Sequence, residues 1–150
     1  MTKSACVAIL DDEKSILASL KRLFSRENFA VRVTTDYRDI LDWVASGEIK
    51  VVVSDHRMPE IRGTELLKQV RDRAPATVRI LFTGYADFAA AEEAINIAGV
   101  YRFITKPWDN HELLAVIHQA IAQYDRNQQK EDELRNLRTR VQELERRLRK

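Results

Sequence analysis

Five short runs of apolar and β-branched residues alternate with segments of helical periodicity, and this alternation constrains the fold more than any other feature. The runs predict strands over 6–10, 29–34, 49–55, 79–83 and 101–105. The segments between and after them predict helices over 16–24, 37–45, 63–73 and 87–98, and a fifth capped by Asn110. Strands that alternate with helices predict an α/β fold, in which a five-stranded parallel sheet carries helices on both faces.

Composition limits the class of protein. A chain of 150 residues can bury one core. Its charged residues reach 32%, which is high for a compact domain and indicates an extra solvated segment. The net charge of +2 is too small to suggest a nucleic-acid or membrane partner. The single Cys6 and the lack of a signal-peptide core or a transmembrane run lead us to expect a cytoplasmic protein.

Polar side chains follow four of the five predicted strands. Asp11 and Asp12 follow the first, Asp55 ends the third, Thr83 ends the fourth and Lys106 follows the fifth. The carboxyl ends of parallel strands meet at one edge of a sheet, where α/β proteins bind ligands. We therefore expect these side chains to converge on one crevice.

Each of these residues also has a structural explanation. Asp12 could cap the helix that follows it, and Asp55 could simply end a strand before the turn at Met58-Pro59. Thr83 could be a strand-end hydroxyl and Lys106 a surface lysine. The combination of these residues favours a functional site over the separate structural explanations, because three adjacent carboxylates repel one another unless a cation lies between them.

Three carboxylates with a hydroxyl and an ammonium indicate a particular chemistry. Carboxylate oxygens suit a hard divalent cation, here Mg²⁺. Such a cation, together with Lys106 and Thr83, would stabilise an incoming phosphoryl group. One carboxylate could then act as a nucleophile and form an acyl phosphate.

With these motifs in place, the chain resembles the receiver domain of bacterial two-component response regulators. The resemblance covers about residues 5–124 and rests on Asp11-Asp12, Asp55 with Met58-Pro59, Thr83-Gly84 and Lys106-Pro107. It implies a flavodoxin-like sheet with strand order 2-1-3-4-5. It also implies a phosphorylation-dependent signalling switch.

The resemblance assigns the acceptor and the metal ligands. Asp55 would accept a phosphoryl group from a histidine kinase or a phosphotransfer protein. Asp12 would bind Mg²⁺ directly, Asp11 mainly through water, and Asp55 and the backbone carbonyl of Arg57 would complete the protein ligands.

It also assigns the residues that respond to phosphorylation. Lys106 would pair with a phosphoryl oxygen, and Thr83 would hydrogen-bond to the group and move toward it. Phe103 occupies the family's switch aromatic position, and we expect its ring to be at least partly buried in the core. The Lys106-Pro107 bond is expected to be cis, as is usual in the family.

Two positions bear on phosphate lifetime. In this family the side chains at the positions of Arg57 and Tyr85 flank the phosphoryl group. A large cation and an aromatic ring there would hinder attacking water, so we expect a long-lived phosphate. The run 83–87 with Lys106-Pro107-Trp108 is similar to a subgroup that precedes HD-type phosphodiesterase or AAA+ activator domains.

Residues 125–150 differ from the rest, because they are dense in Arg and Glu and hold no Gly, Pro or aromatic residue. Their apolar residues step by 3 and 4, the a/d repeat of a coiled coil: Leu134, Leu137, Val141, Leu144 and Leu148. In a parallel homodimer Glu133 would meet Arg138 of the partner helix, and Arg140 would meet Glu145. A lone charged helix is the alternative.

These observations predict a receiver domain at 1–124 and a coiled-coil signalling helix or linker at 125–150. We expect an output domain to follow in the natural protein. Phosphorylation would change the pairing of the signalling helix, and this change would control the output domain.

Three other functions each match part of the sequence. Aspartyl-phosphate phosphatases of the haloacid dehalogenase group carry a second Asp two residues after the nucleophile, where this chain has Arg57. A basic zipper would need a basic region just before the leucines, where this chain mixes acids and bases. A pure dimerisation module with a vestigial site remains open. We therefore expect no enzyme acting on an outside substrate, no direct nucleic-acid binding and no membrane binding.

Overall fold

The protein, described here from a computed structural model for residues 6–84, 92, 96 and 98–149, is built on a five-stranded parallel sheet. The strands are β1 (Cys6–Leu10), β2 (Ala30–Thr34), β3 (Val51–Asp55), β4 (Val78–Thr83) and β5 (Arg102–Thr105). Their order across the sheet is β2-β1-β3-β4-β5, and all four pairings are parallel. The predicted fold class and strand order are confirmed.

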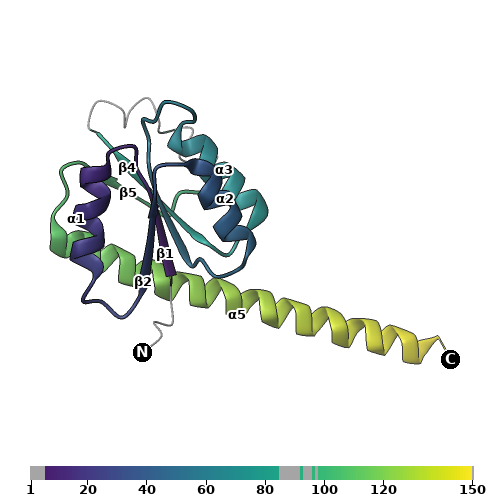
Figure 1. The fold of residues 1–150 in the computed structure, drawn as a ribbon. Coiled ribbons are helices and arrows are strands. Elements are labelled where there is room, and N and C mark those ends of the chain that lie inside the picture. Colours follow the sequence, from purple (N-terminus) through teal and green to yellow (C-terminus); the bar gives the residue numbers. More distant parts are fainter. Residues whose placement is uncertain (1–5, 85–91, 93–95, 97, 150) are drawn as a thin grey trace.

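Helices cover both faces of this sheet. They are α1 (Lys14–Phe24), α2 (Tyr37–Ala45), α3 (Gly63–Arg73) and α5 (Asn110–Leu148). In Figure 1, α1 and the first part of α5 lie on one side of the sheet, and α2 and α3 lie on the other. The predicted helix over 87–98 lies, apart from three of its residues, outside the described residues.

The core consists of two apolar layers, one on each face of the sheet. Val53 of β3 packs toward α1 and α5, whereas its neighbour Val52 packs toward α2 and α3. Successive side chains of a strand point to opposite faces, so a strand that is covered on both faces must be apolar throughout. All five residues of β3 are buried, and its first three are valines for this reason, whereas Ser54 and Asp55 stand at its carboxyl end.

The start of α5 differs from its prediction by one residue. Asp109, not Asn110, caps the helix, because its backbone is extended and its side chain accepts a hydrogen bond from the backbone N–H of Glu112. Asn110 is the first helical residue, and its Oδ1 accepts a hydrogen bond from Trp108. Likewise α1 follows Glu13 at its cap position rather than Asp12.

Helix α5 is the longest element, with 39 residues. At 1.5 Å per residue it is about 58 Å long, so it extends well past the sheet (Figure 1). The predicted boundary between 124 and 125 falls inside this continuous helix. Among the helices of the described segments, none has an apolar stretch long enough to cross a bilayer.

Candidate functional site

The carboxyl ends of the strands bring the predicted site residues together. Asp11 follows β1, Asp55 ends β3, and Asp12 lies beside them, with carboxylate oxygens of all three within 4.8 Å of one another. Parallel pairing causes this convergence, because each strand of the sheet ends at the same edge. The predicted acidic cluster therefore forms across residues more than forty positions apart in the chain.

Lys106 is in contact with two of these acids. Its Nζ donates to Oδ2 of Asp11 at 2.8 Å and lies 3.3 Å from Oδ1 of Asp55. Asp11 is fully buried, and its other oxygen accepts from the backbone N–H of Glu13 at 2.8 Å. Oδ1 of Asp55 also accepts from the backbone N–H of His56 at 2.9 Å.

Burial and neighbouring charges shift the pKa of two groups in the cluster. Burial raises the pKa of Asp55 to about 6, Lys106 lowers it in part, and the nearby charge of Asp11 raises it further. For Lys106, burial alone would lower the pKa, but its hydrogen bond to Asp11 and the charge of Asp55 raise it overall. The single ammonium therefore compensates the three carboxylates only in part.

The cluster fits a divalent cation. Its donors are all oxygen atoms, they converge within 4.8 Å, and Asp12 is exposed, so an ion can reach them. A raised carboxyl pKa means that the ionised form of Asp55 lacks sufficient stabilisation, which a bound Mg²⁺ would supply. Asp11, Asp12 and Asp55 are the side chains that would hold it.

Thr83 and Lys106 are held together by the sheet. The backbone N–H of Lys106 donates to the carbonyl of Thr83 at 3.1 Å, which extends the pairing of β4 with β5 by one residue. Thr83 is buried, and its hydroxyl donates to the carbonyl of Gly84 at 3.2 Å. The Lys106-Pro107 bond is cis, as expected.

Phe103 was expected to lie at least partly in the core, but it belongs to neither core layer and is 45% exposed. Phe103 lies on β5, the edge strand of the sheet, so no further strand flanks it, and it lines a surface cavity together with Trp108 and Val116. Trp108 is partly buried against the core, and its ring stacks on Phe82 with centroids 5.1 Å apart.

The two positions tied to phosphate lifetime are only partly described. Arg57 is exposed on the loop after β3, two residues beyond Asp55. Tyr85 lies outside the described residues. The roles of Arg57, of its carbonyl and of Tyr85 stay predictions.

Gly63 is a site residue that the sequence motifs do not reveal. Its N–H donates to the carbonyl of His56 at 2.9 Å, and a Cβ at this position would collide with the carbonyl oxygen of Asp55 and lie 2.9 Å from Cα of His56. Gly63 thus lets the start of α3 press against the backbone that carries Asp55. A glycine opening a helix just after a strand-end acid was the available signal.

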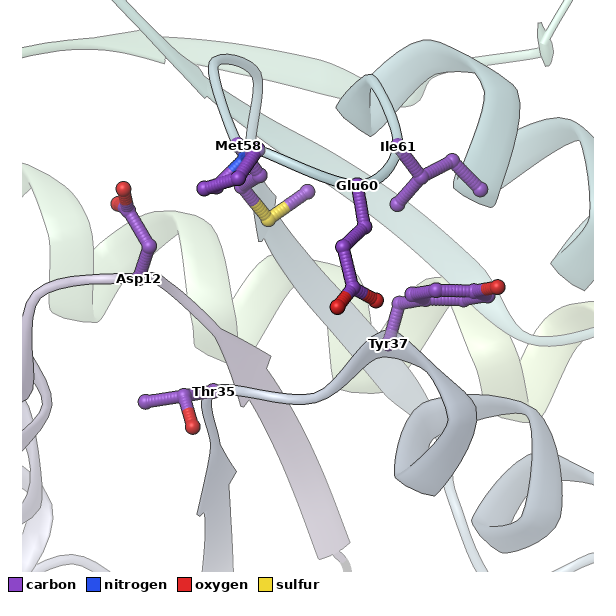
Figure 2. Close-up of a pocket in the computed structure, with 7 residues that line it drawn as sticks. Asp12, Thr35, Tyr37, Met58, Glu60 and Ile61 are labelled. Carbon is purple, nitrogen blue, oxygen red and sulfur yellow. The ribbon is translucent and has the colours of Figure 1, made fainter.

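A surface pocket of about 240 Å³ opens beside the acidic cluster. Figure 2 shows Asp12 on one side of it and Met58, Glu60 and Ile61, from the loop between β3 and α3, on the other. Tyr37, at the start of α2, lies below this loop. The loop after Asp55 therefore forms one wall of the approach to the site.

The fold and the site are those of a receiver-type regulatory domain, and comparison with known proteins identifies the family. A match to the response regulator receiver domain family covers residues 7–118. The chain belongs to this family.

Its relatives carry different names and functions. The hydrogenase transcriptional regulatory protein HoxA of Cupriavidus necator is 34% identical over 119 residues, which cover 79% of this chain and 24% of HoxA. The signal receiver domain of an HD domain-containing protein from Pseudomonas fluorescens Pf-5 has 31% identity and a TM-score of 0.79, over 86% of this chain and 95% of that one. An adenylate cyclase from Rhodopirellula baltica has 32% identity and a TM-score of 0.81, over 88% of this chain and 98% of that one. The chain spans about a quarter of the length of HoxA.

Proposed function

We propose that this chain is a phosphorylation-dependent switch in which Asp55 accepts a phosphoryl group from a histidine kinase or a phosphotransfer protein. The observation that carries the proposal is the position of Lys106, whose Nζ lies 3.3 Å from Oδ1 of Asp55 and 2.8 Å from Oδ2 of Asp11. A carboxylate beside a fixed ammonium and two further acids has the parts that phosphoryl transfer requires.

The transfer forms one bond and breaks another. An oxygen of Asp55 bonds to phosphorus while the bond from phosphorus to the imidazole nitrogen breaks, and that nitrogen keeps the electron pair and takes up a proton. Lys106 then pairs with a phosphoryl oxygen, and the Thr83 hydroxyl, at the end of the neighbouring strand, donates to another. Asp11, Asp12 and Asp55, with the backbone carbonyl of Arg57, would hold Mg²⁺, which would supply positive charge for the phosphoryl oxygens.

The intact mass of the protein tests this proposal. After incubation with Mg²⁺ and acetyl phosphate, the native chain should gain one phosphoryl group, and the gain should require Mg²⁺. Asp55→Asn should gain none, whereas Asp42→Asn, on the exposed face of α2, should behave as the native chain. A native chain that gains no mass and also binds no beryllofluoride would exclude the switch.

We further propose that residues 125–150 pair with a second copy as a parallel coiled coil and pass the change to an output domain. The five predicted seam residues are between 51% and 85% exposed: Leu134, Leu137, Val141, Leu144 and Leu148. Exposed leucines in an a/d repeat are stabilised by burial against another helix. The relatives named above include a transcriptional regulator, an HD-domain protein and a cyclase, so this receiver type is compatible with several outputs.

A second candidate function is a dimerisation module whose site no longer reacts. The exposed seam favours it, because pairing through the seam would not require the acidic site to react. The two candidates are separated by the mass experiment, since a module with a vestigial site would dimerise without gaining phosphate. Under both, the protein acts through partners and not on an outside substrate.

A further inference from the structure

Helix α5 contacts the receiver beyond the point where the coiled coil was expected to begin. Its inward face is marked by residues that step by 4 and 3: buried Leu113, Ile117 and Ala120, then half-buried Tyr124, Asn127 and Glu131. This face therefore stays covered through residue 131. The coiled-coil seam starts three residues later, at Leu134.

One line of residues is shared by the inward face and the seam. Leu113, Ala120, Asn127, Leu134 and Val141 follow one another at intervals of seven. In a heptad that takes Leu134 as position a, all of them are a positions. The same side of α5 is thus covered by the receiver up to Asn127 and is open from Leu134 onward.

Two polar contacts hold the helix at this junction. Nζ of Lys50 lies 2.9 Å from Oδ1 of Asp125 and 5.5 Å from the centre of the Tyr124 ring. Nδ2 of Asn127 donates to the carbonyl of Ala76 at 3.1 Å, and its Oδ1 accepts from Gln123 at 2.8 Å. We call the pairs Lys50–Asp125 and Asn127–Ala76 the latch.

We infer that the latch sets the upstream limit of the coiled coil with a second copy of this chain, and that its release lengthens the seam by one heptad. While Asn127 is bonded to Ala76, it cannot face a partner helix, so pairing begins at Leu134. Once released, Asn127 can hydrogen-bond to the same residue of the second copy, since an Asn at an a position favours a parallel two-stranded pairing. This inference rests on the coiled coil proposed above.

The chemistry of the latch suits a reversible contact. Lys50 is 24% exposed and Asp125 is 58% exposed, so solvent reaches the pair from the side of Asp125, and ion pairs that solvent reaches are individually weak. Lys50 immediately precedes β3, whose last residue is Asp55, and Ala76 lies two residues before β4, whose last residue is Thr83. Two continuous strands, β3 and β4, therefore join the latch to the site. The latch lies at the amino ends of these strands and the site at their carboxyl ends, about 17 Å apart.

Cysteine cross-linking of the full chain tests the inference, in a Cys6→Ala background. Lys130→Cys reports on the d position that the latch should keep unpaired, Leu137→Cys on the d position of the proposed seam, and Thr139→Cys on an outward position. With the latch intact, we expect Leu137→Cys to form a disulfide-linked dimer. Lys130→Cys should form no more of this dimer than the outward control Thr139→Cys does.

Latch variants are then added to the Lys130→Cys reporter. Lys50→Glu places an acid against Asp125, and we expect dimer formation to rise about fivefold, the factor by which losing such a pair and adding repulsion shifts an equilibrium. Asn127→Ile, which removes the bond to Ala76 and supplies an apolar a residue, should raise it further. Lys68→Glu, an exposed change on α3, is the matched control and should leave it unchanged.

Each outcome has a distinct meaning. Equal linking at Lys130→Cys and Leu137→Cys with an intact latch would overturn the inference, as would background linking at Lys130→Cys in both latch variants. Failure of Leu137→Cys to link would overturn the seam as well. Phosphorylation of Asp55 is measured separately by mass, so failure of the switch chemistry is distinguished from failure of the latch.

Discussion

Nζ of Lys106 lies 2.8 Å from Oδ2 of Asp11, a carboxylate that is fully buried. The two residues are 95 positions apart in the chain, and the parallel sheet alone brings them together. This ion pair ties the end of β5 to the end of β1 across the site, so the residue expected to bind the phosphoryl group also stabilises the unphosphorylated fold.

Loss of this pair should destabilise the metal-free protein. Lys106→Met leaves the charge of Asp11 buried with one partner fewer, so we expect the free energy of unfolding to fall by about 3 kcal/mol. Mg²⁺ should reduce the difference in the free energy of unfolding between Lys106→Met and the native chain, because the cation would supply the missing positive charge. Urea unfolding with and without Mg²⁺ measures both effects, with Lys68→Met, exposed on α3, as the control. A variant as stable as the native chain without Mg²⁺ would contradict the role of the pair.

Asp55→Asn should stabilise the metal-free protein in a pH-dependent way. The pKa of Asp55 is raised in the folded state from its ordinary value of 3.8 to about 6, so its protonated form stabilises the fold below pH 3.8. That stabilisation is lost as the pH rises through about 6. Asn carries no charge, so thermal unfolding should show equal stability of variant and native chain near pH 4, and a more stable variant at pH 7.5. Asp42→Asn should show no such divergence, and a constant difference for Asp55→Asn would argue against the raised pKa.

Gly63→Ala should lower the stability of the protein and slow the phosphorylation of Asp55, although residue 63 is not a ligand of the site. The added Cβ would collide with the carbonyl oxygen of Asp55, and overpacking of this kind costs about 1–3 kcal/mol, which exceeds the helix-propensity gain of up to about 1 kcal/mol. We therefore expect lower stability and slower phosphorylation by acetyl phosphate, measured by calorimetry and intact mass. Glu65→Ala, exposed on the same helix, is the control. A variant with unchanged stability and rate would show that α3 can shift without disturbing Asp55.

Polar changes in the seam should abolish dimers without unfolding the receiver. Leu137→Lys with Leu144→Lys places charges at two d positions, where they would be buried between helices. Both side chains are more than half exposed in the single chain, so we expect an unchanged melting temperature of the receiver. Sedimentation equilibrium should show monomers for this variant and dimers for Thr139→Lys, an outward position. Dimers that persist in the double variant would locate the interface elsewhere.

Arg57→Ala should shorten the life of the phosphorylated state. Arg57 is exposed two residues after Asp55, and the resemblance to the receiver family implies that its side chain flanks the phosphoryl group, where we expect it to hinder attacking water. Decay of the phosphorylated mass after removal of acetyl phosphate should become severalfold faster, whereas Arg62→Ala, at the far end of the same loop, should decay as the native chain. Equal decay of Arg57→Ala and the native chain would leave no role for this side chain.

Much of the molecule follows from local patterns. Strands and helices were predictable because apolar periodicity reflects burial, and in a parallel α/β sheet both faces of each strand are covered. The convergence of Asp11, Asp55 and Lys106 was also predictable, because strand ends share one edge whatever the packing details. The core position of Phe103 was predicted wrongly, since the strand order alone does not tell which side chains of an edge strand are covered by the rest of the fold.

The sequence by itself determined the α/β class, the acidic cluster and the heptad repeat of 134–148, because each depends on spacing along the chain. Tertiary structure alone decided that Lys106 contacts Asp11 most closely, that Gly63 presses on the backbone of Asp55, and that Asn127 bonds to Ala76 instead of facing outward. These contacts join residues far apart in sequence. Their distances depend on how the helices pack on the sheet, which no local pattern encodes.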